Sequence, residues 1–201
     1  GEKRTFKFEG EPTVFAGGAF SKDGVESTNK YNGEETYAKA EVIYYGDINL
    51  LPVNIIEVVL LGQDNTCFAN LICYGSLDDI KNVYGTYTVD VKHEVGKMAK
   101  SAGVNKKEGY VFPSFVVRNY SQNEGDYYLV DGGTLTIEDG KISFDLVSEN
   151  GSTFKTTYTG KISIKSYDEA YNAPQVKAPA FKSAINVAKN QPLNYKAIKL
   201  F

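Results

Sequence analysis

The sequence predicts an all-β fold, an antiparallel β-sandwich of the jelly-roll or Greek-key type with about ten strands. The clearest observation is the stretch 133–164, where apolar residues recur at every second position, the period of a strand with one buried face. Asp139-Gly140 and Asn150-Gly151 interrupt this alternation, and such pairs supply the positive φ angles of tight hairpins. We therefore expect a meander of four antiparallel strands in this stretch.

The composition also favours strands over helices. The chain has 201 residues, of which 42% are apolar, enough to bury one full core. Its 15 Tyr and 11 Phe outnumber a single Met and an absent Trp, and aromatic side chains suit half-buried pleated surfaces. We expect most of these rings to lie in the core or in cross-strand pairs.

Turn residues separate the remaining predicted strands. We expect strands at 5–8, 37–46, 53–61, 68–74, 85–91, 110–120 and 127–130, followed by the four strands of the meander. The run 53–61 is apolar except for Asn54 and Glu57, which is typical of a central strand buried on both faces. Pro113 removes a ladder donor, so its strand should lie at an edge or carry a bulge. The stretches 21–35 and 96–108 are polar and are expected to be connections.

The chain changes character after Ile164. Three prolines punctuate this segment, and apolar residues at helical spacing predict one short C-terminal helix at 180–189. We expect a β-sandwich domain at 1–165 and a basic segment at 166–201 that packs on it. Residues 171–201 contain five lysines and no acid, so this segment is either a solvated or docked tail, or a strap across the acidic first half of the chain or of a partner.

Charge and hydropathy exclude two classes of protein. The net charge of −3 argues against a nucleic-acid binder, and the absence of any run of 18 apolar residues argues against a membrane-spanning helix. Cys67 and Cys73 would lie on one face of a single strand about 20 Å apart, too far for a disulfide. Two free thiols are therefore expected, and they leave the redox compartment open.

The residues that could support catalysis are sparse. His93 is the single histidine, no G-x-S-x-G motif is present, and neither cysteine has a nucleophile motif around it. His93 is expected to be a surface residue at a strand end. One histidine and two distant cysteines cannot complete a zinc site, and no D-x-D-x-D loop is present for calcium. The sequence therefore predicts no catalytic residue, no metal and no cofactor.

A pair of carboxylates could still support glycoside hydrolysis. The acids expected within strands are Glu41, Glu57, Asp90 and Asp145. Glu57 stands out because its strand is so apolar, and a buried carboxylate there should have a raised pKa or a partner. Since no second acid is tied to it in the sequence, a hydrolase is less favoured than a binding protein.

Binding requires less sequence machinery than catalysis. Adjacent strand residues face opposite sides, so the pairs Tyr44-Tyr45 and Tyr127-Tyr128 should each place one ring inward and one outward. An outward ring could stack on a sugar or on a partner protein, helped by Asp126 and Asn123. The predicted ligand-binding residues are Tyr44, Tyr45, Asp126, Tyr127 and Tyr128.

Several strand motifs resemble a known group of proteins. The sequence contains A-K-A-E-V-I-Y-Y-G-D at 38–47, G-T-Y-T from Gly85, G-G-T-L-T-I from residue 132, D-G-K from Asp139 and Y-T-G-K from Tyr158. Together they resemble exported lipoproteins of unknown function from gut anaerobic bacteria. The resemblance covers residues 38–164 and implies an all-β fold, a signal peptide with a lipidated cysteine ahead of Gly1, and a location in the cell envelope, at the outer-membrane surface or in the periplasm. It carries over no catalytic residue.

These observations lead to one preferred function and three alternatives. We expect a non-enzymatic envelope protein that binds a glycan or a protein and meets the membrane through its N-terminal lipid anchor alone. Because the chain begins at Gly1 without a methionine, we expect that the signal peptide has been removed. The alternatives are a fimbrial or other assembly subunit whose tail acts as a donor strand, a calycin-like carrier of an apolar ligand, and a glycoside hydrolase.

Overall fold

The structure, a computed structural model, describes residues 26–48, 51–64, 66–101, 103–105, 110–121 and 124–172. Within these ranges, thirteen strands form one eleven-stranded sheet and one separate hairpin. The strands are β1 (Asn32–Glu34), β2 (Lys39–Tyr44), β3 (Asn54–Leu61), β4 (Phe68–Gly75), β5 (Gly85–Asp90), β6 (Lys97–Ala99), β7 (Gly103–Asn105), β8 (Tyr110–Phe112), β9 (Phe115–Ser121), β10 (Glu124–Glu138), β11 (Lys141–Ser148), β12 (Thr153–Thr159) and β13 (Ile162–Ser166). The prediction of an all-β fold is confirmed.

Five of the strands close the sheet on itself. β4 pairs with β6, β6 with β5, β5 with β10, β10 with β9, and β9 again with β4. This ring is a small barrel, and the other strands extend it on both sides: β3, β2 and β13 follow β4, whereas β11, β12 and β1 follow β10. The predicted sandwich did not include this closure.

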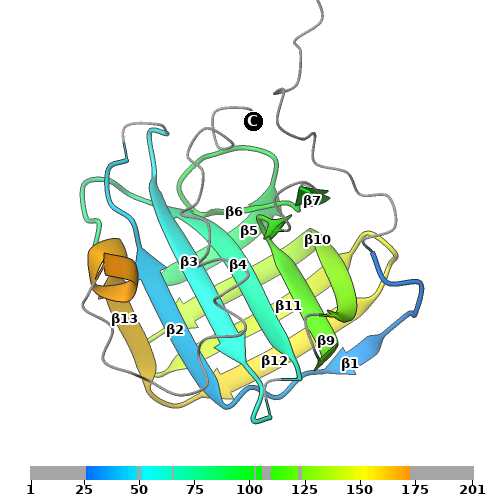
Figure 1. The fold of residues 1–201 in the computed structure, drawn as a ribbon. Helices are drawn as coiled ribbons and strands as arrows, with labels where there is room; N and C mark the ends of the chain where they lie inside the picture. The colour runs from blue at the N-terminus through cyan, green and yellow to red at the C-terminus, as the bar shows by residue number, and fades with distance from the viewer. Residues whose placement is uncertain are drawn as a thin grey trace, which may run out of the picture.

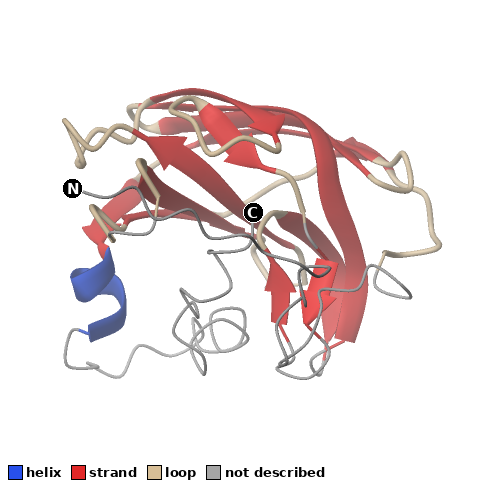
Figure 2. Ribbon diagram, turned by 90° about the horizontal axis from the view of Figure 1, so that it is seen from above, coloured by secondary structure: helices blue, strands red, loops and turns tan. Residues whose placement is uncertain are grey.

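The extended strands form two layers around one apolar core. Figure 1 shows β13, β2, β3, β4 and β9 in front and β10, β11, β12 and β1 behind them, with the strands of the two layers crossing steeply. Viewed from above, the sheet curves around the space between the layers (Figure 2). Val58 and Leu71 of the front layer and Leu135 and Phe144 of the back layer belong to the same buried cluster. Apolar side chains therefore occupy the interior.

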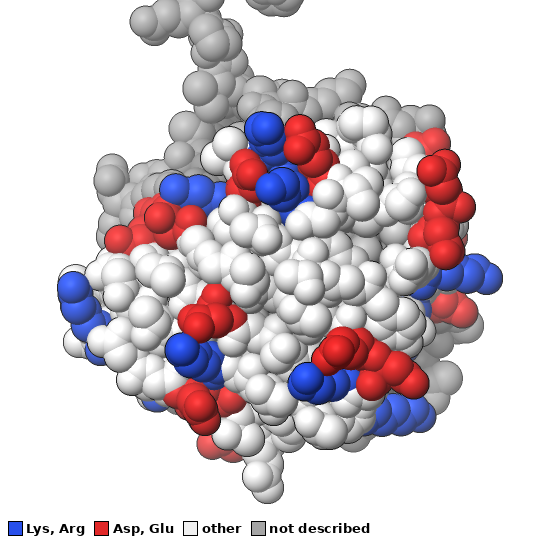
Figure 3. Space-filling view, turned by 180° about the vertical axis from the view of Figure 1, so that it is seen from behind, with Lys and Arg blue, Asp and Glu red and all other residues white. Residues whose placement is uncertain are grey.

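The outer face of the back layer is exposed and nearly neutral. Figure 3 shows Lys and Asp or Glu side chains in small mixed groups on a largely uncharged surface. Lys141 lies 2.9 Å from Glu138, and Lys155 lies 3.0 Å from Asp145. Because strand alternation sends apolar residues inward, this face keeps polar and threonine side chains.

The predicted meander is confirmed for three of its four strands. β10, β11 and β12 pair antiparallel in sequence order, and Gly140 and Gly151 adopt the expected positive φ angles of 68° and 80°. The prediction is wrong for the fourth strand, because β13 leaves the meander at Gly160 and pairs parallel with β2. A strand that changes layers connects the back sheet to the front one.

Other sequence predictions were less complete. Pro113 does interrupt pairing, but it separates two strands, β8 and β9, rather than forming a bulge in one. The expected connections 21–35 and 96–108 contain the three-residue strands β1, β6 and β7, which are too short to give a periodic signal. The predicted strand 5–8 and helix 180–189 lie outside the described residues.

β3 is buried along its whole length, as its apolar sequence predicts. All eight residues from Asn54 to Leu61 are buried, and β3 lies between β2 and β4. Its inward residues join the core, while Val59 and Leu61 belong to a second apolar cluster on the opposite face. Glu57 lies on that opposite face.

Helical structure is limited to a single turn in the described ranges. η1 (Asp168–Asn172) is a π-helical turn that follows β13 directly. Glu169 Oε2 accepts hydrogen bonds from the Ser166 backbone N–H (2.7 Å) and hydroxyl (2.9 Å), a capping arrangement at the start of the turn. Such a turn is far below the length and hydropathy of a membrane span, and no other described segment qualifies as one.

β10 is irregular in its middle, where its register with β11 shifts between Val130 and Gly132 and Gly133 has a positive φ, and this bend allows a direct test. Gly133 has φ +114°, and a Cβ there would lie 2.8 Å from Leu146 Cα and closer still to the Asp145 carbonyl oxygen. Gly133→Ala should lower the free energy of unfolding by about 3 kcal/mol, because it combines a forbidden backbone angle with a backbone clash. Urea denaturation measures this loss.

The neighbouring glycine is the matched control. A Cβ at Gly132 would meet no atom within 4 Å. Gly132→Ala should therefore change the free energy of unfolding by less than about 1 kcal/mol. Equal effects of the two substitutions would contradict this explanation of the bend.

Candidate functional site

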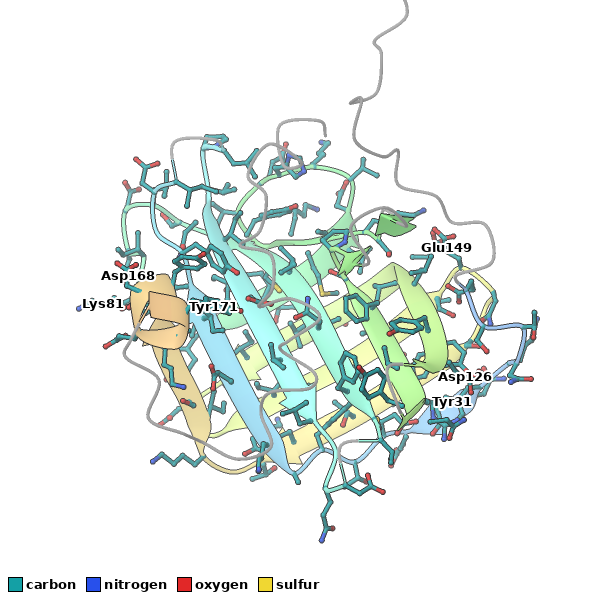
Figure 4. The ribbon with its side chains drawn as sticks, in the orientation of Figure 1. Tyr31, Lys81, Asp126, Glu149, Asp168 and Tyr171 are labelled. Atoms are coloured by element: carbon teal, nitrogen blue, oxygen red, sulfur yellow. The ribbon has the colours of Figure 1, made fainter. Side chains whose placement is uncertain are left out.

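Polar side chains gather in two places on opposite sides of the molecule. In Figure 4, Asp126 and Tyr31 lie near each other at the right, beside β1 and β9. Tyr171 lies at the left, on η1, at the opposite edge of the molecule. We call the first group the Asp126 cluster, made of Ser27, Asn29, Asn119 and Asp126, and the second the Glu57 cluster, made of Tyr45, Glu57 and Tyr171.

Three side chains donate hydrogen bonds to the Asp126 carboxylate. The Ser27 hydroxyl donates to Oδ1 at 2.9 Å, the Asn29 amide donates to Oδ1 at 3.4 Å, and the Asn119 amide donates to Oδ2 at 2.7 Å. These bonds, with Asn119 contributing most, lower the pKa of Asp126 below its ordinary value. The carboxylate is thus fixed in position and ionised at neutral pH.

Asn119 owes its position to an irregular backbone. Its φ of 53° is the one positive value found at a non-glycine residue in the described part of the chain. Asp126 pairs with Arg118, but Glu124 pairs with Ser121, so the β9 strand carries one extra residue at this point. Asparagine tolerates the left-handed region better than most residues. Such local strain is often found at functional sites.

An ion pair lies beside this cluster, at one end of the interior. Arg118 is opposite Asp126 in the strand register, and its Nε lies 2.5 Å from Glu35 Oε1. The guanidinium carbon lies 3.7 Å from the centroid of the Tyr31 ring, which also stacks on Phe154 at 5.1 Å. Tyr31 therefore packs against both neighbours and offers no free platform for a sugar ring.

The Cys67 thiol joins the same ion pair. Its Sγ donates a hydrogen bond to Glu35 Oε2 at 3.2 Å. Burial, reinforced by the charge of Glu35, raises the pKa of Cys67 to about 12. Cys67 and Cys73 are both free, as predicted. A thiol that stays protonated at neutral pH is a poor nucleophile, so this cluster has no cysteine chemistry.

Glu26 fastens the first described segment to the sheet. Its Oε2 accepts the Leu129 backbone N–H at 2.6 Å, and its Oε1 accepts the Asn150 backbone N–H at 3.3 Å. The Asn150 amide donates in return to the Ser27 carbonyl oxygen at 2.7 Å. Partial burial raises the pKa of Glu26. This anchoring places Ser27 and Asn29 against Asp126.

The Glu57 cluster has the burial and partners that the sequence predicted for Glu57. The side chain is 4% exposed, and Oε2 accepts hydrogen bonds from the hydroxyls of Tyr171 (2.7 Å) and Tyr45 (2.8 Å). Burial raises the pKa of Glu57 despite these two bonds, and the charge of Glu41 raises it further. The prediction of a raised pKa or a partner is confirmed on both counts.

Glu41 and Glu57 meet one requirement of a hydrolase and fail another. Glu57 is opposite Ile43, so Glu41 is its diagonal neighbour, with Cα atoms about 7 to 8 Å apart. Two residues in this relation can carry the catalytic acids of a hydrolase, whose carboxyl groups lie about 5 to 9.5 Å apart. Both side chains are buried, however, and Lys165 Nζ lies 3.0 Å from Glu41 Oε2. The pair is engaged within the protein rather than displayed in a groove.

The predicted alternation within the tyrosine pairs is confirmed. Tyr128 is 1% exposed in the core against Phe154, and Tyr127 packs on the opposite face. Tyr44 packs against the core, and Tyr45 lies on the face that carries Glu57. The outward rings are still not free, because Tyr45 donates to Glu57 and Tyr127 packs near Phe115.

The structure does not bring the predicted binding residues together. Tyr127 lies level with Lys39 across the sheet, through the successive cross-strand pairs Tyr127–Val117, Val117–Phe68, Phe68–Leu61 and Leu61–Lys39. Tyr45 follows Lys39 by six residues, which is about 20 Å along a strand. Of the five predicted residues, Asp126 alone lies in a cluster with exposed polar side chains, those of Asn29 and Asn119.

The partners of both clusters carry no periodic signal in the sequence. Ser27, Asn29 and Asn119 fall in stretches without periodicity or in the middle of a predicted strand. Arg118 and Asn119 are adjacent polar residues within a predicted strand, and this is the one signal in the sequence for an irregular polar site there. Tyr171 lies beyond the predicted domain boundary at 165, so its contact with Glu57 could not be anticipated.

The remaining candidate residues have ordinary surroundings. Asp90 forms an ion pair with Lys97 at 3.2 Å, and His93 contacts the edge of the Tyr74 ring. Burial lowers the pKa of His93. In the part of the chain that the structure describes, no three His, Cys, Asp or Glu side chains gather as metal ligands.

Comparison with known proteins adds no assignment. No protein-family model, no curated protein and no solved structure matches this chain.

The protonated state of Cys67 can be tested by alkylation. With a pKa of about 12, Cys67 should react slowly with iodoacetamide at pH 8, and the rate should keep rising beyond pH 10. Glu35→Gln removes the charge that helps to raise this pKa and should accelerate the reaction about tenfold. Mass spectrometry of the labelled peptide separates Cys67 from the fully buried Cys73.

Asp145→Asn, on the opposite face, is the control and should leave the alkylation rate of Cys67 unchanged. A rate that reaches a plateau near pH 9 would contradict the prediction.

Proposed function

We propose that this protein is a non-enzymatic cell-envelope lipoprotein that binds a glycan at the Asp126 cluster. The observation that carries the proposal is the Asp126 carboxylate, which three side chains from two segments hold in one orientation: Ser27 and Asn29 precede β1, and Asn119 belongs to β9. A carboxylate fixed in this way, with exposed amides beside it, can accept and donate hydrogen bonds to sugar hydroxyls without reorganising.

The charge of the cluster narrows the ligand class. Asp126 carries the one formal charge of the cluster, and the neighbouring Arg118–Glu35 ion pair is neutral overall. The local charge of about −1 disfavours sulfated or uronic sugars and favours neutral or amino sugars. The planar amides of Asn29 and Asn119 and the Asp126 carboxylate can each form hydrogen bonds with two neighbouring hydroxyls of a sugar ring.

Two observations favour binding over catalysis or transport. Glu41 and Glu57 are buried and already paired, which does not favour a hydrolase. Large apolar side chains such as Tyr128, Phe154 and Leu135 fill the interior, which does not favour a carrier of an apolar ligand. A surface binding site is compatible with both observations.

A second candidate function, an assembly subunit, is favoured by the edge strand β13. Among the described strands, β13 pairs with β2 alone, and its residue Ile164 is 37% exposed. An edge of this kind can accept a strand from another molecule. Light scattering over a range of concentrations would support this candidate if oligomers form and an Ile164→Lys substitution abolishes them.

We further propose that the fold is a β-sandwich related to the jelly-roll type, modified by the five-strand closure. Support comes from the two crossing layers, whose inward residues form a shared core. Strands that change layers at corners, as β13 does after Gly160, are typical of such packing.

The glycan proposal is tested by binding of the labelled 201-residue chain to a glycan array, followed by calorimetry with the best ligand. Asp126→Ala should weaken the binding at least about tenfold, because it removes a charged hydrogen-bond acceptor. Asn119→Gly keeps the left-handed backbone accessible while deleting the amide, and should weaken the binding severalfold. Asp145→Ala is the control, an exposed acid of the opposite face.

Two results would overturn the glycan proposal. One is the absence of binding to any neutral or amino glycan on the array. The other is binding that survives Asp126→Ala unchanged while circular dichroism shows the variant to be folded.

A further inference from the structure

One buried carboxylate fastens the last described turn to the sheet. Tyr171 of η1 and Tyr45 at the end of β2 donate their hydroxyls to the same oxygen of Glu57, at 2.7 and 2.8 Å. We propose that Glu57, Tyr45 and Tyr171 form a pH-sensitive latch, which holds η1 against the sheet when Glu57 is protonated and loosens as Glu57 ionises.

The closed state of the latch is defined by packing as well as by hydrogen bonds. The Tyr45 and Tyr167 ring centroids are 4.9 Å apart, and those of Tyr167 and Tyr171 are also 4.9 Å apart. The ring planes are tilted by 43° and 44°, so the three rings form a continuous row of contacts from the end of β2 to η1. Opening of η1 would break this row and expose Glu57 to water.

The surroundings of Glu57 make its charge costly. Its strand neighbours Ile56 and Val58 are fully buried, and its cross-strand partners are Ile43 and Ile72. A buried carboxylate without a positive partner favours its neutral form.

The other charged and titratable groups around the latch do not offset that cost. The described elements that pack around it contribute Glu41 from β2, Tyr45 directly after β2, Tyr74 from β4, Lys165 from β13, Tyr167, Asp168, Glu169 and Tyr171 at η1, and Lys81, which lies beside η1 (Figure 4). Lys165 lies 3.0 Å from Glu41, and Glu41 itself adds negative charge near Glu57. Of the two described lysines near η1, Lys165 is thus paired with Glu41, and Lys81 acts on Glu169.

The direction of the pH response follows from the two states. In the closed state, burial raises the pKa of Glu57 above its ordinary value of 4.5, whereas in the open state water restores that value. The closed state therefore binds the proton more tightly, so protonation favours closure. As pH rises from 4.5 towards the raised pKa, the ratio of open to closed molecules should increase about tenfold per pH unit and then level off.

Opening of this latch need not unfold the domain. η1 has five residues, follows the edge strand β13, and begins at an exposed cap formed by Ser166 and Glu169. Short terminal elements of this kind open at much lower free energy than a central sheet. The latch sets the position from which the chain continues into residues 173–201, which contain five lysines and no acid.

Hydrogen exchange of the full chain, followed by mass spectrometry from pH 4.5 to pH 9, tests the proposal. After correction for intrinsic exchange rates, protection of peptides covering 167–172 should fall at least about tenfold across this range, whereas β3 should stay protected. Glu57→Gln keeps an oxygen that accepts both phenol hydroxyls but cannot ionise. Its protection over 167–172 should be independent of pH.

Two further variants separate the latch from its surroundings. Tyr171→Phe retains the ring and loses one hydrogen bond, so its protection should be lower at every pH. Glu41→Gln removes a negative neighbour and frees Lys165, so the fall should persist with its midpoint at a lower pH. Protection of wild-type 167–172 that is independent of pH, or a Glu57→Gln variant that responds like the wild type, would overturn the proposal.

A measurement on the unmodified chain guards against a variant that fails to fold. Carbon-detected NMR can follow the Glu57 carboxyl directly through the same pH range. Its titration midpoint should lie above 4.5 and coincide with the change in exchange at Tyr171. A midpoint at or below 4.5, or one unrelated to the exchange, would overturn the latch.

Discussion

The irregular stretch of β10 from Val130 to Gly133 is the constraint on which the architecture depends, because the register with β11 shifts between Val130 and Gly132 and Gly133 has a positive φ. Before it, residues 124–129 pair with β9; beyond it, β10 pairs with β11 on one side and with β5 on the other. A straight strand could not reach both neighbours, because β9 belongs to the front layer through β4. The positive φ of Gly133 provides the change of direction, and the close approach of β11 excludes a side chain. Closure of the barrel therefore depends on backbone geometry at this position.

The interior and the ends of the described chain are stabilised by different forces. Apolar side chains from both layers fill the interior, where burial alone provides the driving force. In the first and last described segments, carboxylates also contribute: Glu26 accepts two backbone N–H groups, and Glu57 accepts two phenol hydroxyls. Both carboxylates have raised pKa values because burial opposes their charge. Attachment of the ends is consequently more sensitive to solution conditions than the core.

The sequence predicted the parts of the fold that local rules determine. Alternation and the Asp-Gly and Asn-Gly turns predicted β11 and β12 and their hairpins, and the apolar run predicted the burial of β3. Glu57 was recognised because a carboxylate in such a run requires compensation. Pairing between distant segments could not be predicted in this way. β13 was assigned to the meander because nothing local indicates that it pairs with β2, and β1 and β6 are too short to show a period.

The same limit explains why one predicted site residue in five joined an exposed polar cluster. Adjacent tyrosines were expected to face opposite sides, and they do, but the outward face is itself buried at Tyr45. Asp126 became part of a cluster through Asn119, whose conformation arises from a change of register between β9 and β10. Register depends on the whole sheet, so a single strand's sequence does not reveal it.

The two clusters respond to pH in opposite directions, and this separates their roles. Hydrogen bonds from Asn119 and Ser27 lower the pKa of Asp126, so its contribution to stability is present above the ordinary value of 3.8 and is lost only as pH falls through the lowered value. Burial raises the pKa of Glu57, so its protonated form persists above 4.5 and favours the closed turn in mild acid. In a mildly acidic environment, the Asp126 carboxylate keeps its charge while the Glu57 latch closes. One chain thus combines a surface carboxylate that remains ionised with a buried carboxylate that becomes neutral, because donors surround the first and apolar strands surround the second.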